Sequence, residues 1–238
     1  MDAKSPAERM ASWDWEALRA DVDRRGAAQT PVLLTPAECA DIAALYDRDP
    51  LFRTTVVMAR HGYGEGEYRY FADPVPQSVA ALRAAAYAGL APLARAWAPA
   101  IGIDHSIPDT LDDFRAVCAT AGQTRPTPLL LRYGAGGWNA LHQDIYGGVV
   151  FPLQMAILLS DPARDFTGGD FLLVEQRPRM QSRGDSFRLA QGQGIVFATR
   201  SRPVRGARGT YRTALRHGVS TVTAGRRMTL GLILHDAA

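Results

Sequence analysis

The C-terminal half of the chain is a series of short apolar or alternating segments, and this pattern limits the possible folds more than any other feature. From residue 128 onward, glycine, proline and aspartate separate the segments PLLLRYG, FPLQMAILLSD, GGDFLLVEQ, GIVFATR, YRTALRHGVSTV and RMTLGLILHD. Many short strands at close spacing are typical of an antiparallel sandwich or barrel. We therefore expect residues 123–238 to form an antiparallel double-stranded barrel.

The first half has helical periodicity instead. The segment WDWEALRADVDRRG has apolar residues at helical spacing and ends at Gly26. In LTPAECADIAALYDRD, Thr35, Pro36 and Glu38 have the spacing of a helix N-cap, first position and capping box. A long alanine-rich helix, broken or kinked near Pro92, and a shorter one ending at Gly122 should follow. The predicted fold class is α+β, a single domain with helical support at 1–122 and a mainly β core at 123–238.

The segment 53–76 fits neither pattern. It combines several glycines with arginines and tyrosines, among them Arg60, Tyr63 and Arg69. One interpretation is a mobile lid that closes over a planar, anionic ligand, because glycine provides freedom, arginine charge and tyrosine a stacking surface. The other interpretation is a hairpin that packs on the barrel.

The bulk properties exclude some classes of protein. No apolar run approaches the roughly 20 residues that a membrane helix needs. The N-terminal segment MDAKSPAERMASWDWEALRAD has no apolar core of the signal-peptide type. The two cysteines, Cys39 and Cys118, are distant in sequence and are predicted to be reduced, buried thiols. We expect a cytoplasmic protein with no membrane partner.

Positive charge is concentrated near the C-terminal end. The net charge is only +3, yet twelve arginines lie from Arg177 to Arg227, with Asp185 as the single acidic residue among them. Such a bias can prepare a surface for phosphate or another anion. The alternative is that these arginines are solvated side chains on the outward faces of strands.

The segment LHQDIYG contains the strongest chemical signal. Residues two apart on a strand project to the same side, so His142 and Asp144 can ligate one metal ion together. His217, in a later predicted strand, completes a set of two histidines and one carboxylate. This is the facial triad of non-haem Fe(II) oxygenases, which leaves coordination positions open. These three residues are the predicted metal ligands and the predicted catalytic centre.

Three further residues indicate a site for a dicarboxylate. Arg227 lies ten residues after His217, and its guanidinium can hold a carboxylate with two parallel hydrogen bonds. Thr229 points to the same side of that strand and can add a third hydrogen bond. Tyr133 lies nine residues before His142, and a glycine turn between them lets its phenol reach the same carboxylate.

The order of these residues resembles the Fe(II)/2-oxoglutarate-dependent oxygenase superfamily over residues 128–236. The shared pattern is H-x-D, then Gly168-Gly169-Asp170 before a strand, a glycine leading to Phe197, and the distal histidine and arginine. The resemblance implies a double-stranded β-helix, or jelly roll, with iron at His142, Asp144 and His217. It also implies 2-oxoglutarate at Arg227, with Arg226 as the alternative anchor. The implied reaction uses dioxygen to hydroxylate a C–H bond while 2-oxoglutarate is decarboxylated to succinate.

The segment RYGAGGWNALHQD is similar to the corresponding run of AlkB-type nucleic-acid demethylases. The stretches MARHG, GEYRYF, GQTRPTPLLLRYG, RPRMQSR and GARGTYR also resemble a bacterial family described as oxygenases that repair damaged nucleic acid by oxidative demethylation. This resemblance implies a single-stranded or damaged nucleic-acid substrate whose base is flipped into the pocket. The predicted substrate-binding residues are Tyr146, Arg60, Tyr63 and Arg69.

The chain departs from the AlkB-type pattern at three positions. Leu131 stands where those enzymes have an asparagine, Tyr146 where an acidic residue reads the base, and Ile233 where a second arginine follows. The spacing of ten between His217 and Arg227 fits the prolyl-hydroxylase-like branch better. One alternative function is therefore hydroxylation of protein side chains or small molecules. A second alternative, from another class, is a non-catalytic metal-binding barrel of the cupin type.

Overall fold

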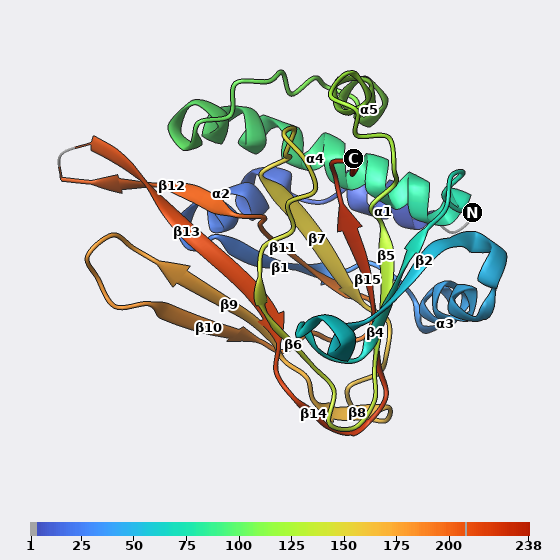
Figure 1. Cartoon of the computed structure of the whole chain (residues 1–238). Coiled ribbons are helices and arrows are strands. Elements are labelled where there is room, and N and C mark those ends of the chain that lie inside the picture. The colour runs from blue at the N-terminus through green and yellow to red at the C-terminus, as the bar shows by residue number, and fades with distance from the viewer. Residues whose placement is uncertain (1–3, 208) are drawn as a thin grey trace.

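Two antiparallel sheets form the body of the computed structural model, which describes residues 4–207 and 209–238 (Figure 1). The larger sheet has seven strands in the order β1-β11-β7-β15-β5-β4-β2. The smaller sheet has the order β10-β9-β13-β6-β3, with β12 paired to β13, and β14 pairs with β8 separately. Residues of both sheets line one central cavity. The α+β class and the double-stranded β-helix core that the sequence predicts are confirmed.

The strands are β1 (Ala27–Val32), β2 (Phe52–Val57), β3 (Gly64–Glu65), β4 (Glu67–Phe71), β5 (Leu129–Tyr133), β6 (Trp138–His142), β7 (Leu153–Leu158), β8 (Phe166–Gly168), β9 (Phe171–Gln176), β10 (Arg183–Phe187), β11 (Gln193–Ala198), β12 (Ser201–Gly206), β13 (Gly209–Val219), β14 (Val222–Gly225) and β15 (Arg227–Ile233). The α-helices are α1 (Pro6–Ala11), α2 (Trp15–Arg25), α3 (Pro36–Ala44), α4 (Gln77–Ile101) and α5 (Leu111–Thr120), and η1 (Leu45–Asp47), η2 (Asp49–Leu51) and η3 (Met58–His61) are short 3-10 helices.

The N-terminal half contributes strands as well as helices. The segment 53–76 forms a hairpin rather than a lid, because β2 and β4 pair antiparallel and β4 continues onto β5. The prediction of mainly helical support at 1–122 did not include β1, which pairs with β11 at the edge of the larger sheet. Pro31 interrupts the alternation of β1, and the register shifts between Gln29 and Val32. An edge strand tolerates this proline because one side of it needs no hydrogen-bond donors.

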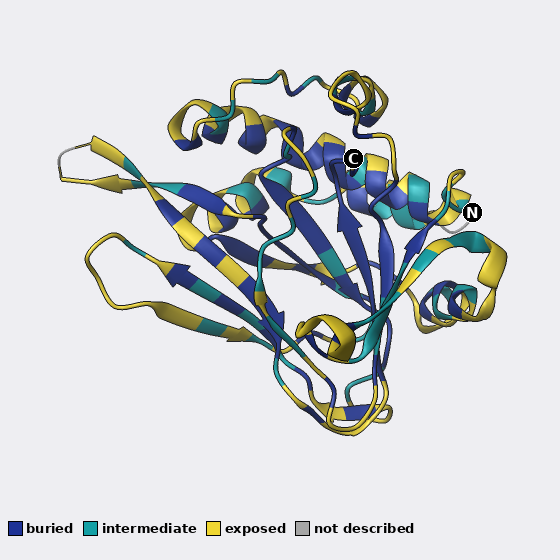
Figure 2. Cartoon of the chain, in the orientation of Figure 1, coloured by how far each residue is buried: buried dark blue, intermediate teal, exposed yellow. Residues whose placement is uncertain are grey.

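Helix α4 lies across the outer face of the larger sheet (Figures 1 and 2). Its buried residues recur every three or four positions, from Val79 through Leu90 to Ile101, because one face of the helix packs on the sheet. The helix continues through Pro92 without the expected break. Pro92 removes the hydrogen-bond donor to the carbonyl of Ala88. The adjacent carbonyl of Gly89 accepts a hydrogen bond from Arg19, outside the helix, at 3.0 Å. In the part of the chain that the structure describes, no helix has both the length and the apolar character needed to cross a membrane.

Candidate active site

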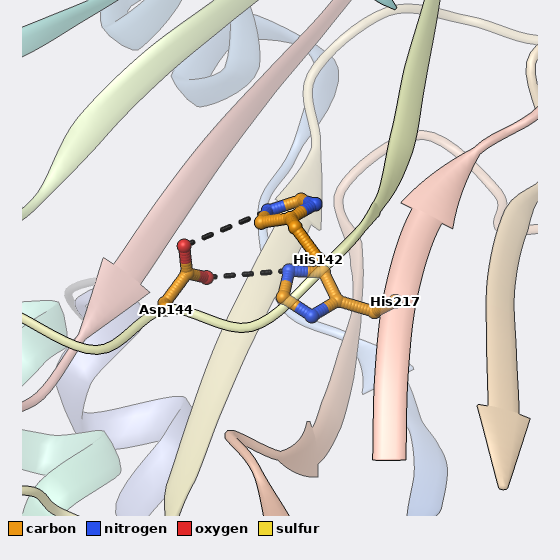
Figure 3. A group of neighbouring side chains, drawn as sticks. All are labelled: His142, Asp144 and His217. Carbon is orange, nitrogen blue, oxygen red and sulfur yellow. Dashed lines mark ion pairs between the residues drawn. The ribbon is translucent and has the colours of Figure 1, made fainter. Parts of the chain in front are cut away.

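The three predicted metal ligands converge between the two sheets (Figure 3). His142 is the last residue of β6, and its Cα partner on the neighbouring strand β13 is His217. One ligand atom from each of His142, Asp144 and His217 can be chosen so that all three lie within 4.8 Å of one another. Asp144 lies two residues beyond the end of β6, so the argument that both ligands share a strand is wrong. The chain turns out of the strand after His142 and still brings the carboxylate to the two imidazoles.

A β-bulge on β6 determines which side chains face the cavity. His217 pairs with His142 and Val219 pairs with Asn139, so β6 has one more residue than β13 between these pairs. A bulge of this kind redirects side chains. Asn139 and His142, three apart in sequence, therefore both line the cavity. Glycine is required at position 218 on the opposing strand, because a Cβ there would lie 2.6 Å from the carbonyl oxygen of Asn139.

The donor atoms fit a divalent metal ion. Nε2 of His142 lies 3.5 Å from Oδ1 of Asp144, and Nε2 of His217 lies 3.2 Å from Oδ2 (Figure 3). Nδ1 of His142 lies 2.7 Å from the carbonyl oxygen of Ala140. When Nδ1 carries the proton and donates it to this carbonyl, Nε2 presents its lone pair to a metal. Two imidazole nitrogens and one carboxylate suit Fe(II) and leave coordination positions open.

The charges at the centre also favour a cation. Burial would raise the pKa of the Asp144 carboxyl, but hydrogen bonds to His142 and His217 and their charges outweigh it, so the pKa lies well below its usual range. Burial would lower the pKa of His142, but Asp144 outweighs it and the pKa is raised. For His217, burial and the charge of His142 prevail over Asp144 and lower the pKa. Asp144 is therefore a half-buried, ionised carboxylate.

Tyr146 contacts Asp144, one of the three predicted metal ligands, rather than facing freely into the cavity. Its hydroxyl donates to Oδ1 of Asp144 at 2.7 Å and accepts from the hydroxyl of Tyr70 at 2.9 Å. Burial and the negative charge of Asp144 raise the pKa of Tyr146, so the phenol stays protonated and remains a donor. A chain of two tyrosines therefore orients the carboxylate, as partners of metal ligands commonly do.

We expect Tyr146→Phe to weaken metal binding about 10- to 100-fold, the usual effect of removing a group that orients a ligand. Titration of the protein with Co(II), followed by visible absorbance, measures this without turnover. Tyr70→Phe removes only the outer hydrogen bond of the chain and should have the smaller effect. Unchanged Co(II) affinity in Tyr146→Phe would show that Asp144 is held in place without the phenol.

The predicted dicarboxylate residues surround one end of the same cavity. Arg227 and Tyr133 are Cα partners on β15 and β5. Both are buried, whereas Arg226 is exposed. Arg227 donates to Oγ1 of Thr229 at 2.6 Å, and its Nε is buried without a hydrogen-bond partner among the described residues. A buried guanidinium that has a free donor, and that forms no ion pair with the residues described, can bind an anion, so Arg227 is better placed than Arg226 for this role.

Asn139 belongs to the same end of the cavity, and the sequence prediction missed it. Its amide donates to the hydroxyl of Tyr133 at 3.3 Å. Burial raises the pKa of Tyr133 to about 12, which keeps its hydroxyl protonated. The phenol can therefore accept from Asn139 and donate to a carboxylate. No sequence signal identifies Asn139, because the bulge that turns it inward cannot be read from the spacing.

The cavity has a volume of about 340 Å³ and contains the metal triad and Arg227. Tyr63 and Tyr146 line it as predicted, but Arg60 and Arg69 are not among its lining residues. Arg69 instead donates to the carbonyl of Tyr46 at 2.5 Å and pairs with Asp49 at 2.8 Å. Alternation along β4 explains this, because Tyr68 and Tyr70 face the cavity and Arg69 must face the other side. The same alternation in the sequence could have identified Tyr68 and Tyr70.

Comparison with known proteins agrees with this geometry. Residues 66–237 match the model of a family described as "Oxygenase, catalysing oxidative methylation of damaged DNA". Two uncharacterised proteins from strains of Mycobacterium tuberculosis are each 55% identical over 168 residues, which cover 71% of this chain and 72% of theirs.

Solved structures show the same fold at low sequence identity. A 2OG-Fe(II) oxygenase family oxidoreductase from Burkholderia pseudomallei has a TM-score of 0.57 and 19% identity, covering 95% of this chain and 94% of its own. A Pseudomonas putida prolyl-4-hydroxylase has a TM-score of 0.52 and 14% identity, covering 91% and 96%. The chain belongs to the damaged-DNA oxygenase family, and it is an Fe(II)/2-oxoglutarate-dependent oxygenase that uses dioxygen.

Proposed function

We propose that this oxygenase removes N-linked methyl groups from damaged bases in single-stranded or locally unpaired nucleic acid. The observation that carries the proposal is the cavity itself, in which tyrosines line a space that contains the metal triad. Aromatic side chains hold a base by stacking whatever its sequence, and a base must leave the duplex to reach such a cavity. The family description names damaged DNA, which agrees with this substrate class.

The residues of the chain divide the work between two ends of the cavity. Arg227, Thr229 and Tyr133 would hold the distal carboxylate of 2-oxoglutarate, and His142, Asp144 and His217 would hold Fe(II). With dioxygen, this centre supplies hydroxylation of a C–H bond coupled to conversion of 2-oxoglutarate into succinate and carbon dioxide. A hydroxylated N-methyl group then breaks down to the free base nitrogen and formaldehyde, so the C–N bond is cleaved after the oxidation.

The tyrosines act on the substrate by position. Tyr63 is 49% exposed and lies at the cavity surface, where a base entering from solvent can stack on it. Tyr68, which follows later in the sequence, is half-buried and also lines the cavity. The hydroxyl of Tyr146 is hydrogen-bonded to Asp144, so Tyr146 would contact the base through its ring rather than its hydroxyl. A cytoplasmic location, which fits a nucleic-acid substrate, remains part of this proposal.

The test is incubation of the protein with Fe(II), 2-oxoglutarate and a single-stranded oligonucleotide that carries one N-methylated base. Mass spectrometry of the oligonucleotide and a succinate assay should show methyl loss with stoichiometric succinate. The same oligonucleotide in duplex form should react more slowly, because unpairing costs free energy. If the protein formed succinate only in the presence of a candidate peptide, and removed no methyl group from any oligonucleotide, the proposal would be contradicted. Side-chain hydroxylation would then be favoured.

A further inference from the structure

Two neighbouring hairpins extend from the sheet that carries His217. They are β9–β10, residues 171–187, and β12–β13, residues 201–219. Their inner strands pair antiparallel, from Val219 opposite Phe171 to Ala214 opposite Gln176. Beyond this pairing the two tips project from the same side of the molecule, and both are largely exposed (Figures 1 and 2). Both hairpins are thus anchored beside the metal centre and reach into solvent.

These hairpins carry most of the C-terminal arginine excess. The exposed or half-buried arginines on or beside them are Arg177, Arg179, Arg183, Arg188, Arg200, Arg205, Arg212 and Arg216. Three of them pair with carboxylates, namely Arg177 with Glu175 at 3.3 Å, Arg183 with Asp185 at 3.0 Å and Arg188 with Asp170 at 3.3 Å. Arg208, which the sequence places in the β12–β13 turn, lies outside the described residues.

The remaining arginines have uncompensated charge. Within residues 4–207 and 209–238, no carboxylate forms an ion pair with Arg179, Arg200, Arg205, Arg212 or Arg216. Of these five, Arg212 donates to the carbonyl oxygen of Ile101 at 3.2 Å. An exposed guanidinium that lacks an acidic neighbour is available to a phosphate, which it can bind with two parallel hydrogen bonds. The hairpins therefore present free positive charge in addition to their three ion pairs.

The hairpins are connected to the cavity through the loop that carries the metal ligand. Gln143 lines the cavity, and its amide donates to the carbonyl oxygens of Arg200 and Leu215 at 3.1 and 2.7 Å. Along β13, Gly209 lies eight residues before His217, about 26 Å at about 3.3 Å per residue. A nucleic-acid strand that leaves the cavity past Gln143 can thus reach the exposed arginines of the hairpin tips after several nucleotides. Arg212 and Arg216 alternate with His217 along β13, so they lie on the other face of this strand.

We infer that the β9–β10 and β12–β13 hairpins bind the sugar–phosphate backbone of the nucleic-acid strand whose base enters the cavity. This inference rests on the proposed function and specifies where the flanking nucleotides lie. Binding is electrostatic and independent of sequence, because guanidinium–phosphate contacts do not read bases. It must therefore weaken as the salt concentration rises.

The test compares two double variants of the full-length protein. Arg179→Ala with Arg205→Ala removes one free charge from each hairpin tip. The matched control, Arg25→Ala with Arg48→Ala, removes two exposed arginines that also form no ion pair among the described residues and lie outside both hairpins. The probe is a fluorescently labelled, single-stranded oligonucleotide that carries no methylated base. Its fluorescence anisotropy gives Kd at several salt concentrations.

The hairpin variant should bind roughly tenfold more weakly at low salt, and the slope of log Kd against log salt should fall by about 1.4, since each lost phosphate contact on a single strand removes about 0.7. The control should stay within about twofold of wild type, because no phosphate contact is lost. Equal weakening in the two variants, or none in the hairpin variant, would overturn the inference.

Turnover separates this inference from the proposed function. With a methylated oligonucleotide, the hairpin variant should show a raised KM and an unchanged kcat, whereas a methylated mononucleoside should react equally well with both proteins. Methyl loss from the oligonucleotide with an unchanged KM in the hairpin variant would overturn the inference and leave the function intact. Oligonucleotide binding that depends on the hairpins, without any methyl loss, would overturn the function and leave the binding surface.

Discussion

Asp144→Ala is expected to abolish 2-oxoglutarate turnover and to weaken metal binding by more than about 100-fold. Loss of a residue that only orients a ligand weakens metal binding by at most about 100-fold, and loss of the ligand itself should cost more. The physical reason is that Asp144 supplies the only carboxylate of the triad. Its removal leaves the half-buried imidazole of His142 and the buried one of His217, 4.2 Å apart between ring centroids, without the negative charge that compensates a cation. Succinate formation measures turnover, and Co(II) titration measures metal affinity independently.

The control for this variant is Asp41→Ala, which removes an exposed aspartate that forms no ion pair among the described residues. It should leave both measurements unchanged. Circular dichroism of both variants would establish that the fold is retained. If Asp144→Ala kept its oligonucleotide affinity and its turnover, the assignment of the metal centre to this triad would be wrong. Retained oligonucleotide affinity with lost turnover is the expected pattern for an oxygenase.

Arg227→Ala is expected to raise the Kd for 2-oxoglutarate by about 30- to 5000-fold, which corresponds to the roughly 2–5 kcal/mol lost when one partner of a buried charge pair is truncated. Arg227 is 3% exposed, so solvent screens its interaction with a bound carboxylate very little. Calorimetric titration of the metal-loaded protein with 2-oxoglutarate measures the affinity, and the KM for 2-oxoglutarate should rise in parallel.

Arg226→Ala is the matched control, because it removes the neighbouring, exposed arginine from the same chain segment. It should leave the affinity for 2-oxoglutarate unchanged. Arg227→Lys should be intermediate, since lysine keeps the charge but cannot form two parallel hydrogen bonds. The opposite result, with loss in Arg226→Ala and none in Arg227→Ala, would transfer the anchor to Arg226.

Local signals in the sequence predicted the elements that depend on neighbouring residues. The capping box of α3 is present, with Thr35 accepting from the backbone N–H of Glu38 and the Glu38 side chain bonded to the Thr35 backbone. Gly26 ends α2 in the left-handed conformation, at φ 83°. These features were predictable because their partners lie within a few residues of each other. The long helix α4 was predicted for the same reason, although the effect of Pro92 was overestimated.

The order of His142, Asp144, His217 and Arg227 predicted a metal and dicarboxylate site, because each residue type has a distinct coordination or hydrogen-bonding chemistry. The structure brings all four side chains to one cavity. Their arrangement was not predictable in detail. Asp144 lies outside the strand. Arg226 and Arg227 are chemically identical, and the structure favours Arg227 because it is buried and lines the cavity.

Only the tertiary structure decided the features that depend on residues distant in sequence. The bulge opposite Gly218 turns Asn139 inward, and it arises from the pairing of β6 with β13, about 80 residues later in the chain. Tyr146 orients Asp144 because Tyr70, from a hairpin in the N-terminal half, occupies its other side. Arg69 is withdrawn from the cavity because Asp49 and Tyr46 lie on its face of β4. The sequence by itself determined which chemistry this protein carries, and long-range strand pairing decided which side chains surround it.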